Sequence, residues 1–302
     1  MVQKSIDSVD FRLLQVFVAV VEAGGFAAAE VTLNLGLSTI SAHMKALETR
    51  LGLTLCQRGR AGFALTEPGA AVYAEARQLI SAGEGFAARV AGLRSRLAGP
   101  VRLGLLDAII GDPAARITEG LAVFARAAPE AEIRLIRRPP DELLRDVAGR
   151  ALDIAVGSFP RVAVGLDYID LYQERHAFYC GKGHPLHDLP DAEITPDTIR
   201  RHRLIGRSYW AARDLSAFAG ERVGAVVADM ESAALLILTG AFLGYLPEHY
   251  AAPYVAAGRM RALAPDRFGY VAQFQLAYLQ DRLEVPRIAA LVEALRRAHG
   301  RG

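Results

Sequence analysis

One short segment near the N-terminus, from Ser38 to Lys45, gathers side chains suited to binding a polyanion. Ser38, Thr39 and Ser41 supply hydroxyl groups, which can reach base edges or phosphates when they lie near the start of a helix. Lys45 and Arg50 supply cations that can neutralise phosphates of a nucleic-acid backbone. The chemistry that this segment favours is therefore recognition of double-stranded DNA.

The apolar residues of the same segment indicate which of its side chains face outward. They recur at spacings of four, three and four, which predicts a helix with one buried face. They are Ile40, Met44, Leu47 and Leu51. A shorter helix over residues 27–33 and a turn over 34–36 come before, and such a pair of helices has helix-turn-helix geometry. A plain helical hairpin with a solvated face is the alternative. The predicted DNA contacts are Ser38, Thr39, Ser41, Ala42, His43, Lys45, Arg50, Arg58 and Arg60.

Residues 55–69 place glycine and arginine around short apolar runs, which predicts a small hairpin. Arg58 and Arg60 would lie on this hairpin as on a wing beside the duplex. Affinity for DNA follows the number of neutralised phosphates, so this modest group of cations predicts strong salt dependence and a need for two copies of the site.

A long helix is predicted after residues 67–69. Apolar or small residues recur every seven positions along it, in one series from Val72 to Leu93 and another from Ala76 to Leu97. Together the two series form an a/d seam, which is typical of a helix that pairs with a second chain. An amphipathic helix packed on its own domain is the alternative.

From residue 99 onward the pattern changes, and buried strands alternate with helices. This alternation predicts a parallel sheet of the α/β class. Asp112 and Pro113 are expected to start the first helix, with Asp112 as its N-cap. Strands near residues 168–172 and 271–279 are candidates for crossings between two α/β lobes.

The order and spacing of several segments resemble those of LysR-type transcriptional regulators. These segments are FRLLQVFVAVVEAGGFAAAE, LSTISAHMKALETRLGLTLCQR, FALTEPG, RALDIAVG, YCGKGHPL and GAFLGYLP. The resemblance implies a winged helix-turn-helix, a dimerising linker helix, and an effector domain of two lobes like those of periplasmic binding proteins. Homodimers or homotetramers are implied with it. The alternative is a small-solute binding module without DNA function, which has no use for residues 10–65.

The resemblance also implies a division of the chain. The expected domains are 1–68 for the winged helix-turn-helix, 69–98 for the linker helix and 99–302 for the effector domain, with lobe I at about 99–170 and 271–302 and lobe II at about 171–270.

A small-molecule effector would bind in the crevice between the lobes, where strand ends and helix N-termini meet. The expected effector contacts are Leu106, Asp107, Ala108, Ser158, Phe159, Arg207, Met230 and Glu231. The family usually has Ser or Thr after the first strand, which suits a carboxylate, whereas Asp107 favours an amine or hydroxyl group. Since Arg207 would hold an anionic group, the expected effector is amphoteric. Local capping by Asp107 and a surface ion pair of Arg207 are the alternatives.

Other chemistries have little support in the sequence. Cys180, His184 and His187 form a Cys-x3-His-x2-His run without an evident fourth ligand, so no metal site is predicted. Ser158 lacks the strand-elbow-helix pattern of a hydrolase nucleophile, and we find no phosphate-binding glycine motif. We therefore expect no enzyme activity and no cofactor.

Bulk properties set the remaining expectations. The chain has 302 residues, 52% of them hydrophobic, which predicts a packed protein of two or three domains. The formal net charge is only +2, so the DNA prediction rests on local charge. The longest uncharged run, 232–247, is shorter than the roughly 20 residues that span a bilayer. Because the N-terminus also lacks a signal-peptide pattern, we expect a soluble, cytoplasmic protein.

Overall fold

The computed structural model describes residues 7–59, 62–91, 97–159, 162–210, 213–218 and 223–300. The chain divides into two compact units, of which the first contains Met1–Val90 and the second contains nearly all of the remaining residues.

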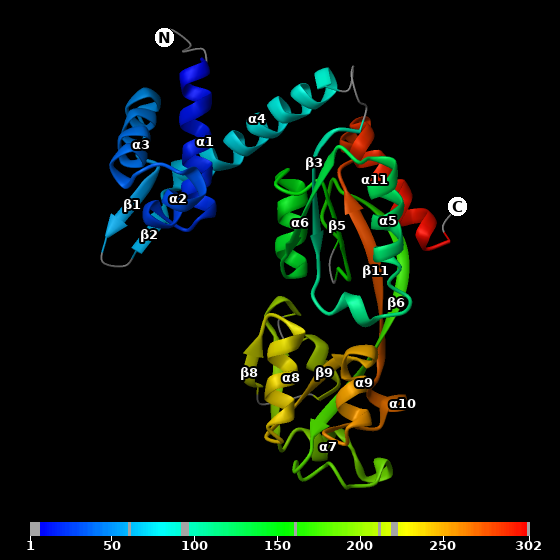
Figure 1. Ribbon diagram of the computed structural model, residues 1–302. Coiled ribbons are helices and arrows are strands. Elements are labelled where there is room, and N and C mark those ends of the chain that lie inside the picture. Colours follow the sequence, from blue (N-terminus) through cyan, green and yellow to red (C-terminus); the bar gives the residue numbers. More distant parts are fainter. Residues whose placement is uncertain are drawn as a thin grey trace. The chain divides into compact units, whose positions relative to one another are not determined.

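The first unit is a set of packed helices with one small hairpin (Figure 1). Its elements are α1 (Ser8–Glu22), α2 (Phe26–Leu33), α3 (Leu37–Leu51), β1 (Cys56–Gly59), β2 (Gly62–Leu65) and α4 (Glu67–Ala91). The strands β1 and β2 pair antiparallel. These elements confirm the helix pair, the hairpin and the long helix expected from the sequence. No single helix in the described ranges is long and apolar enough to cross a membrane, although α1 and α2 pass that test as a pair bent by 118°.

Side chains fix the starts of the helices in this unit. Asp7 caps α1 by accepting from the backbone N–H groups of Val9 and Asp10, and the Asp10 carboxylate accepts from the N–H of Asp7 in return. At the start of α3, Glu30 Oε1 accepts from the N–H of Leu37 at 2.6 Å. These bonds satisfy N–H groups that a helix start leaves without partners.

The buried face of α3 contains Ile40, Met44 and Leu47, as the spacing predicts. Leu51 is the exception, because its side chain is 40% exposed. The helix ends at Leu51, and Gly52 then turns the chain away with a φ of 70°. The prediction that Leu51 belongs to the buried face is therefore wrong.

The first half of the seam on α4 packs against the core of its own unit. Ala76 is buried there, and Val72 and Leu79 pack beside it, whereas Phe86 is 64% exposed. Leu93 lies outside the described residues. Pairing of α4 with a second chain stays a prediction.

The second unit has two lobes built on one mixed sheet with strand order β4-β3-β5-β11-β6-β9-β7-β8, and β10 pairs with β6. Lobe I contains β3 (Gly99–Leu105), η1 (Ile109–Gly111), α5 (Ile117–Ala127), β4 (Ala131–Arg137), α6 (Pro140–Ala148), β5 (Ile154–Gly157), η5 (Gln280–Glu284) and α11 (Pro286–Ala298). Phe124 of α5 and Ile288 of α11 pack on one face of its strands. Leu143 of α6 packs in a second cluster with Ala155 and Ala277, on the other face.

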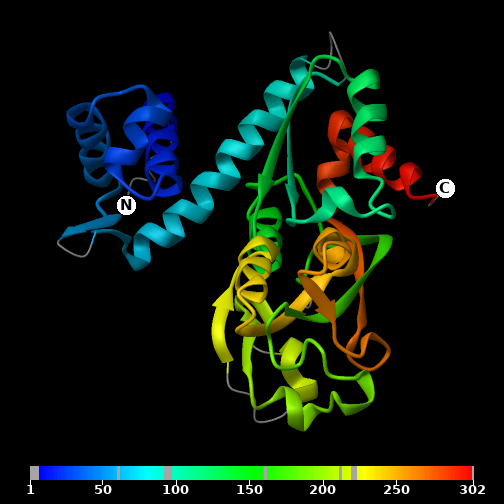
Figure 2. The same ribbon diagram turned by 60° about the horizontal axis from the view of Figure 1, so that its bottom comes forward.

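Lobe II follows the same plan and can be traced in Figure 2. Its elements are η2 (Asp191–Glu193), α7 (Pro196–Ile199), β7 (Arg203–Arg207), η3 (Ser208–Trp210), η4 (Arg213–Phe218), β8 (Val223–Val227), α8 (Met230–Leu238), β9 (Phe242–Pro247), α9 (Glu248–Ala256), β10 (Met260–Ala262) and α10 (Pro265–Phe268). Ile237 of α8 and Ala251 of α9 pack in one cluster, and Ile199 of α7 and Phe268 of α10 pack in another.

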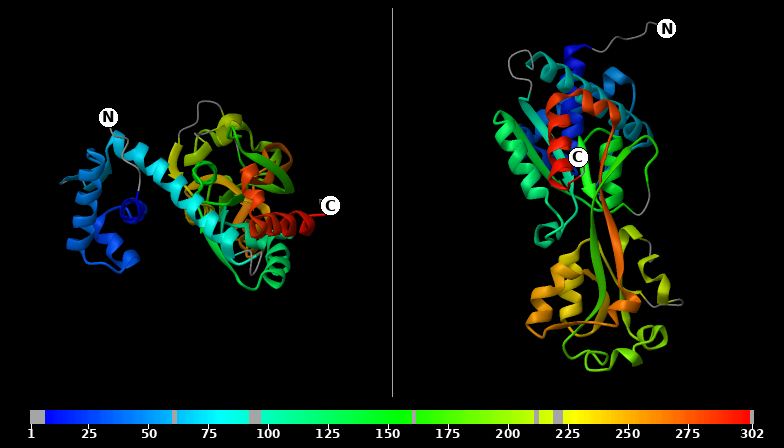
Figure 3. Two further views of the ribbon diagram at one scale, coloured as in Figure 1. Left: turned by 90° about the horizontal axis from the view of Figure 1, so that it is seen from above. Right: turned by 90° about the vertical axis from the view of Figure 1, so that its right-hand side faces the viewer.

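Two long strands run through both lobes, β6 (Asp167–Gly181) and β11 (Tyr270–Tyr278). They pair antiparallel between Asp167–His176 of β6 and Tyr270–Tyr278 of β11, with an irregularity between Phe274 and Gln275. Figure 3 shows the pair passing from one lobe to the other. The crossing strands expected from the sequence are confirmed, and β6 extends well beyond the segment expected near residues 168–172.

The start of α5 differs from the prediction. Asp112 does not cap it, because α5 begins at Ile117 with Arg116 in the N-cap position. The Asp112 carboxylate instead accepts from the N–H of Ala114 at 2.8 Å, in a local turn. A side chain that closes a turn within two residues competes with the helix cap, and here the turn prevails. Asp112 is thereby left at the edge of lobe I.

Candidate functional site

The outward face of α3 carries most of the residues expected to contact DNA. Ser38, Thr39, Ala42 and Lys45 are exposed, and Ser41 and His43 are partly exposed. The backbone of Arg58 lies on β1, but its side chain and all of Arg60 fall outside the described residues. The short polar groups lie in the first two turns of α3, the part of a recognition helix that contacts base edges.

Arg50 has a different environment from Lys45. Its guanidinium pairs with Asp7, with Nη2 2.7 Å from Oδ2, and with the largely buried Asp10. Two carboxylates from the start of α1 already balance this charge. Arg50 is therefore a weaker candidate for a phosphate contact than Lys45, and it ties α3 to α1.

The second unit contains a cleft between the lobes that encloses about 390 Å³, part of it open to solvent. It is lined by Leu106, Asp107, Pro140, Ser158, Glu174, His176, Arg207, Tyr209, Trp210, Met230, Pro247, Tyr270, Ala272 and Phe274. Five of the expected effector contacts are among these residues: Leu106, Asp107, Ser158, Arg207 and Met230.

The other three expected contacts lie elsewhere. Ala108 uses its carbonyl to accept from His249 Nε2 at 2.7 Å. Phe159 packs edge-on against the ring of Tyr168, next to the core under α6. Glu231 is exposed on α8. None of the three is among the residues that line the cleft.

Arg207 lies at the end of β7 and is 5% exposed, which excludes the surface ion pair considered from the sequence. Its Nη2 donates to the hydroxyl of Tyr270 at 2.6 Å, and its guanidinium lies 5.1 Å from the ring centroid of Trp210. A buried guanidinium against aromatic rings, at the wall of a cleft, can bind an anionic group in a setting of low dielectric.

Asp107 follows β3 and faces the opposite lobe. Its Oδ2 accepts from the N–H of Met230, the first residue of α8. Burial raises the pKa of this carboxyl, and the nearby charge of Asp229 adds to the effect. Asp229 caps its own helix, α8, by accepting from the N–H of Ser232. Asp107 thus caps a helix of the other lobe.

A buried pair on β6, which sequence reasoning missed, completes the cleft. Glu174 Oε2 lies 2.6 Å from His176 Nε2, and both side chains are almost fully buried. Burial raises the pKa of Glu174 to about 8 and lowers the pKa of His176 to about 3. The Nδ1 atom of His176 is buried without a hydrogen-bond partner among the described residues. The signal was present, because residues two apart on a strand share one face.

Two family models match the chain. Residues 11–70 match the bacterial regulatory helix-turn-helix protein, lysR family, and residues 94–300 match the LysR substrate binding domain. The chain belongs to the LysR family. It is a transcriptional regulator with a DNA-binding helix-turn-helix and a domain for a small-molecule effector, and the alternative of a binding module without DNA function has no support.

Individual relatives agree with this membership of the LysR family. The HTH-type transcriptional activator BauR from Pseudomonas aeruginosa is 41% identical over 274 residues, which cover 90% of each chain. The crystal structure of the LysR-family regulator CbnR has a TM-score of 0.61 at 23% identity, covering 96% of this chain and 99% of that one. Full-length CbnR in complex with its target DNA has a TM-score of 0.59 at 22% identity, covering 95% and 99%.

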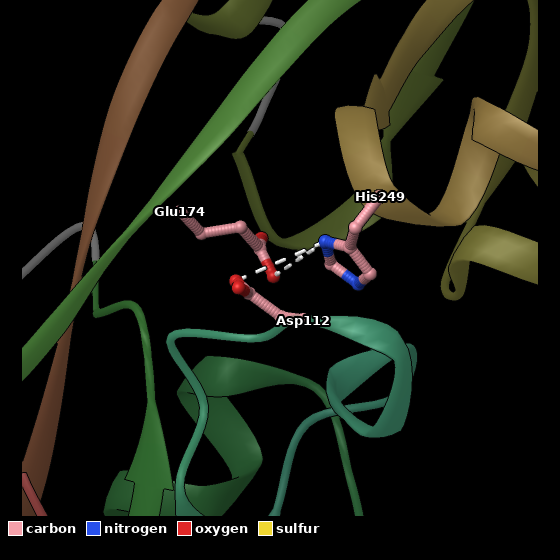
Figure 4. Close-up of side chains that lie close together, drawn as sticks. All are labelled: Asp112, Glu174 and His249. Atoms are coloured by element: carbon pink, nitrogen blue, oxygen red, sulfur yellow. Dashed lines mark ion pairs between the residues drawn. The ribbon is translucent and has the colours of Figure 1, made fainter.

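A second group of polar side chains lies beside the cleft of this LysR-family protein. Asp112, Glu174 and His249 come from three separate elements, and their carboxylates and imidazole point toward one another (Figure 4). None of the predicted site residues belongs to this group. The sequence offered no signal for it, because the three residues are separated by 62 and 75 positions.

Proposed function

We propose that α3 reads operator DNA through Ser38, Thr39, Ser41, Ala42, His43 and Lys45, with Arg58 and Arg60 of the hairpin beside the duplex. The observation that carries this proposal is the exposure of small polar side chains and one lysine on a helix whose opposite face is fully buried. Because it acts on DNA, we place the protein in the cytoplasm, and we assign it no enzyme activity.

A gel-shift titration with the intergenic DNA upstream of the gene tests this proposal. Wild-type protein should give a shift that weakens steeply with salt. Lys45→Ala should lower affinity for all sequences and reduce the slope of log affinity against log salt by about 1, because one phosphate contact is lost. Arg145→Ala removes an exposed arginine of the second unit and should leave both values unchanged. A wild-type protein without a salt-sensitive shift would reject the proposal.

We further propose the domain limits expected from the sequence, 1–68, 69–98 and 99–302, with lobe I at about 99–170 and 271–302 and lobe II at about 171–270. The matches of the two family models, at residues 11–70 and 94–300, support this division.

The effector proposed for the cleft is a small amphoteric molecule. Its anionic group binds the guanidinium of Arg207, and its amine or hydroxyl group binds Asp107. The burial of Arg207 and the partial burial of Asp107 support this assignment, because a charged ligand group is bound most strongly where water is excluded. The unpartnered Nδ1 of His176, among the described residues, offers one further polar contact.

A thermal-shift screen with zwitterionic, anionic and cationic metabolites identifies the effector, because a ligand of the folded state raises the melting temperature. Trp210 is the only tryptophan of the chain, so its fluorescence reports on cleft occupancy directly. A zwitterion should give both signals, and Asp107→Ala or Arg207→Gln should abolish them. A purely anionic hit that Asp107→Ala binds as well as wild type would refute the amphoteric assignment.

Effector binding is expected to act through the lobes. As the lobes close on the ligand, contacts between subunits change, and with them the spacing of the DNA-binding units on the promoter. Bending of DNA depends on that spacing. The assembly proposed is a homodimer or homotetramer.

A further inference from the structure

Three side chains meet at the boundary between the lobes: Asp112 in the loop after η1, Glu174 on β6 and His249 in the first turn of α9. We propose that they bind one divalent transition-metal ion, for which Zn²⁺ is the probe. The site would join lobe I, a crossing strand and lobe II.

The geometry is close to that of a metal site. His249 Nδ1 lies 3.8 Å from Asp112 Oδ2 and 4.0 Å from Glu174 Oε1, and one donor atom of each residue lies within 4.8 Å of the others. Ligands at the usual 2.0–2.2 Å from a tetrahedral zinc ion are about 3.4 Å apart. The separations between the donor atoms exceed that spacing by about 0.4 to 1.4 Å at most, so small rotations of the three side chains would bring the donors together.

The hydrogen bonds around the group leave the right atoms for an ion. His249 Nε2 contacts the carbonyl oxygen of Ala108 at 2.7 Å, so Nε2 carries a proton and Nδ1 is the ring nitrogen that faces the carboxylates. A metal-binding histidine is typically oriented in this way by a carbonyl on its other nitrogen. Asp112 Oδ1 accepts from Ala114 and Glu174 Oε2 pairs with His176, so the second oxygen of each carboxylate faces the centre.

The charges also favour a cation at this place. The side chains of Asp112 and Glu174 are 8% and 4% exposed, so two carboxylates face each other away from water. Two buried anions at this spacing repel each other unless a proton or a cation lies between them. A divalent ion compensates both charges at once.

A buried hydroxyl close to the group provides an independent indication of a ligand. Tyr172 is 6% exposed, and its hydroxyl has no hydrogen-bond partner within the described ranges. Tyr172 lies two residues before Glu174 on β6, so the two side chains leave the strand on the same face. A water molecule in the fourth position of the ion would give the hydroxyl a partner.

The donor set indicates the class of metal. One imidazole nitrogen with two carboxylate oxygens suits zinc and its first-row neighbours, whereas magnesium and calcium sites consist of oxygen ligands alone. Since Glu174 also lines the cleft, the ion would lie beside the effector and would bridge the two lobes.

The test is a Zn²⁺ titration of chelator-treated, full-length protein, followed by competition with a chromophoric chelator. Wild type should bind one ion per chain and gain melting temperature. Asp112→Asn keeps a side-chain oxygen that accepts from the N–H of Ala114, and His249→Gln keeps a side-chain N–H that donates to the carbonyl of Ala108. Both variants should therefore fold. Each should lose affinity by about 100-fold or more, because loss of an outer-shell partner alone costs about 10- to 100-fold.

His187→Gln is the matched control, because it removes another histidine of lobe II that pairs with a carboxylate, Asp188, outside the group. It should bind Zn²⁺ as wild type does. The proposal would be overturned if the wild-type protein bound no stoichiometric Zn²⁺. It would also be overturned if His249→Gln bound Zn²⁺ with wild-type affinity, or if His187→Gln did not bind Zn²⁺. The measurement uses neither DNA nor effector, so its outcome is separate from that of the proposed function.

Discussion

Asp153 shows at the scale of one residue how lobe I depends on a buried charge. Its side chain is 1% exposed, and its Oδ1 lies 3.2 Å from Arg102 Nη2 and also contacts Arg282. Its Oδ2 accepts from the backbone N–H of Arg102 at 2.8 Å. The residue thereby links β3 to η5, where the chain leaves the crossing strand β11 for α11.

Replacing Asp153 by alanine should therefore be strongly destabilising. The free energy of unfolding of the second unit should fall by about 3–5 kcal/mol, because two arginines lose the charge that compensates them. Urea denaturation measures the loss. Glu132→Ala breaks an exposed pair with Arg134 and should cost no more than about 1 kcal/mol. Equal losses in the two variants would contradict this account.

The same residue predicts a dependence of stability on pH. Burial alone would raise the pKa of Asp153, but the charges of Arg102 and Arg282 outweigh it, and the pKa lies below its ordinary value of 3.8. The folded state thus favours the ionised form. Its stabilisation is complete above pH 3.8 and is lost as the pH falls through the lowered value. In denaturation series from pH 7 to pH 3, the stability gap between wild type and Asp153→Ala should be constant at first and should then narrow in acid.

At the scale of elements, the start of α4 requires close approach of two backbone segments. A Cβ atom on Gly69 would lie 1.9 Å from the carbonyl oxygen of Leu55, which precedes β1. The hairpin and α4 can therefore meet only where residue 69 has no side chain. This contact fixes the direction in which α4 leaves the hairpin.

Gly69→Ala should accordingly lower the free energy of unfolding of the first unit by about 1–3 kcal/mol, because backbone must shift to admit the methyl group. Thermal unfolding of the full chain measures the loss. Gly36→Ala is the control, because a Cβ there has nothing within 4 Å and its φ is −69°. Its cost should stay below about 1 kcal/mol. Gly69→Ala with wild-type stability would contradict the predicted clash.

Elements also explain which expected effector contacts line the cleft. Asp107 and Arg207 each follow or end a parallel strand, β3 and β7, where side chains gather at the carboxyl edge of a sheet. Phe159 lies only two residues beyond β5, but its ring turns to Tyr168 and the core of lobe I. Sequence position therefore identified the loops correctly, whereas packing decided which side chains face the cleft.

At the scale of the whole molecule, the strand order of the sheet in the second unit begins at β4 and ends at β8. The edge strands β4 and β8 expose Leu135 and Val226, and α8 beside β8 exposes Leu235. Exposed edges with apolar side chains are places where a second chain pairs. They are natural contact surfaces for the proposed homo-oligomer.

Val226→Lys should reduce the oligomer size measured by light scattering, because a charge on the edge strand opposes burial against another subunit. Val162→Lys alters another exposed valine of the second unit, away from both edge strands, and should leave the size unchanged. If Val226→Lys formed an oligomer of wild-type size, the interface between subunits would not include this edge strand.

Coupling between the cleft and DNA makes a further prediction for the whole molecule. If the effector changes the affinity for operator DNA by some factor, DNA must change the affinity for the effector by the same factor. Trp210 fluorescence titrations with and without operator DNA measure the change in affinity for the effector. Gel shifts with and without effector measure the change in affinity for DNA. Unequal factors would show that the two measurements follow different equilibria.

The sequence by itself determined the helix-turn-helix, the hairpin, the long helix, the crossing strands and the family. These features follow from local apolar periodicity, from glycine and proline at turns, and from motif spacing, all of which act over a few residues. The sequence also indicated Asp107 and Arg207, because both stand at strand ends.

Only the tertiary structure decided the chemistry between the lobes. The burial of the pair of Glu174 and His176 depends on the elements that cover β6, and the meeting of Asp112, Glu174 and His249 depends on where the loop after η1, β6 and α9 approach one another. Burial and proximity set the pKa values and ligand geometry of these groups. Both are properties of chain segments far apart in sequence, and no local pattern carries them.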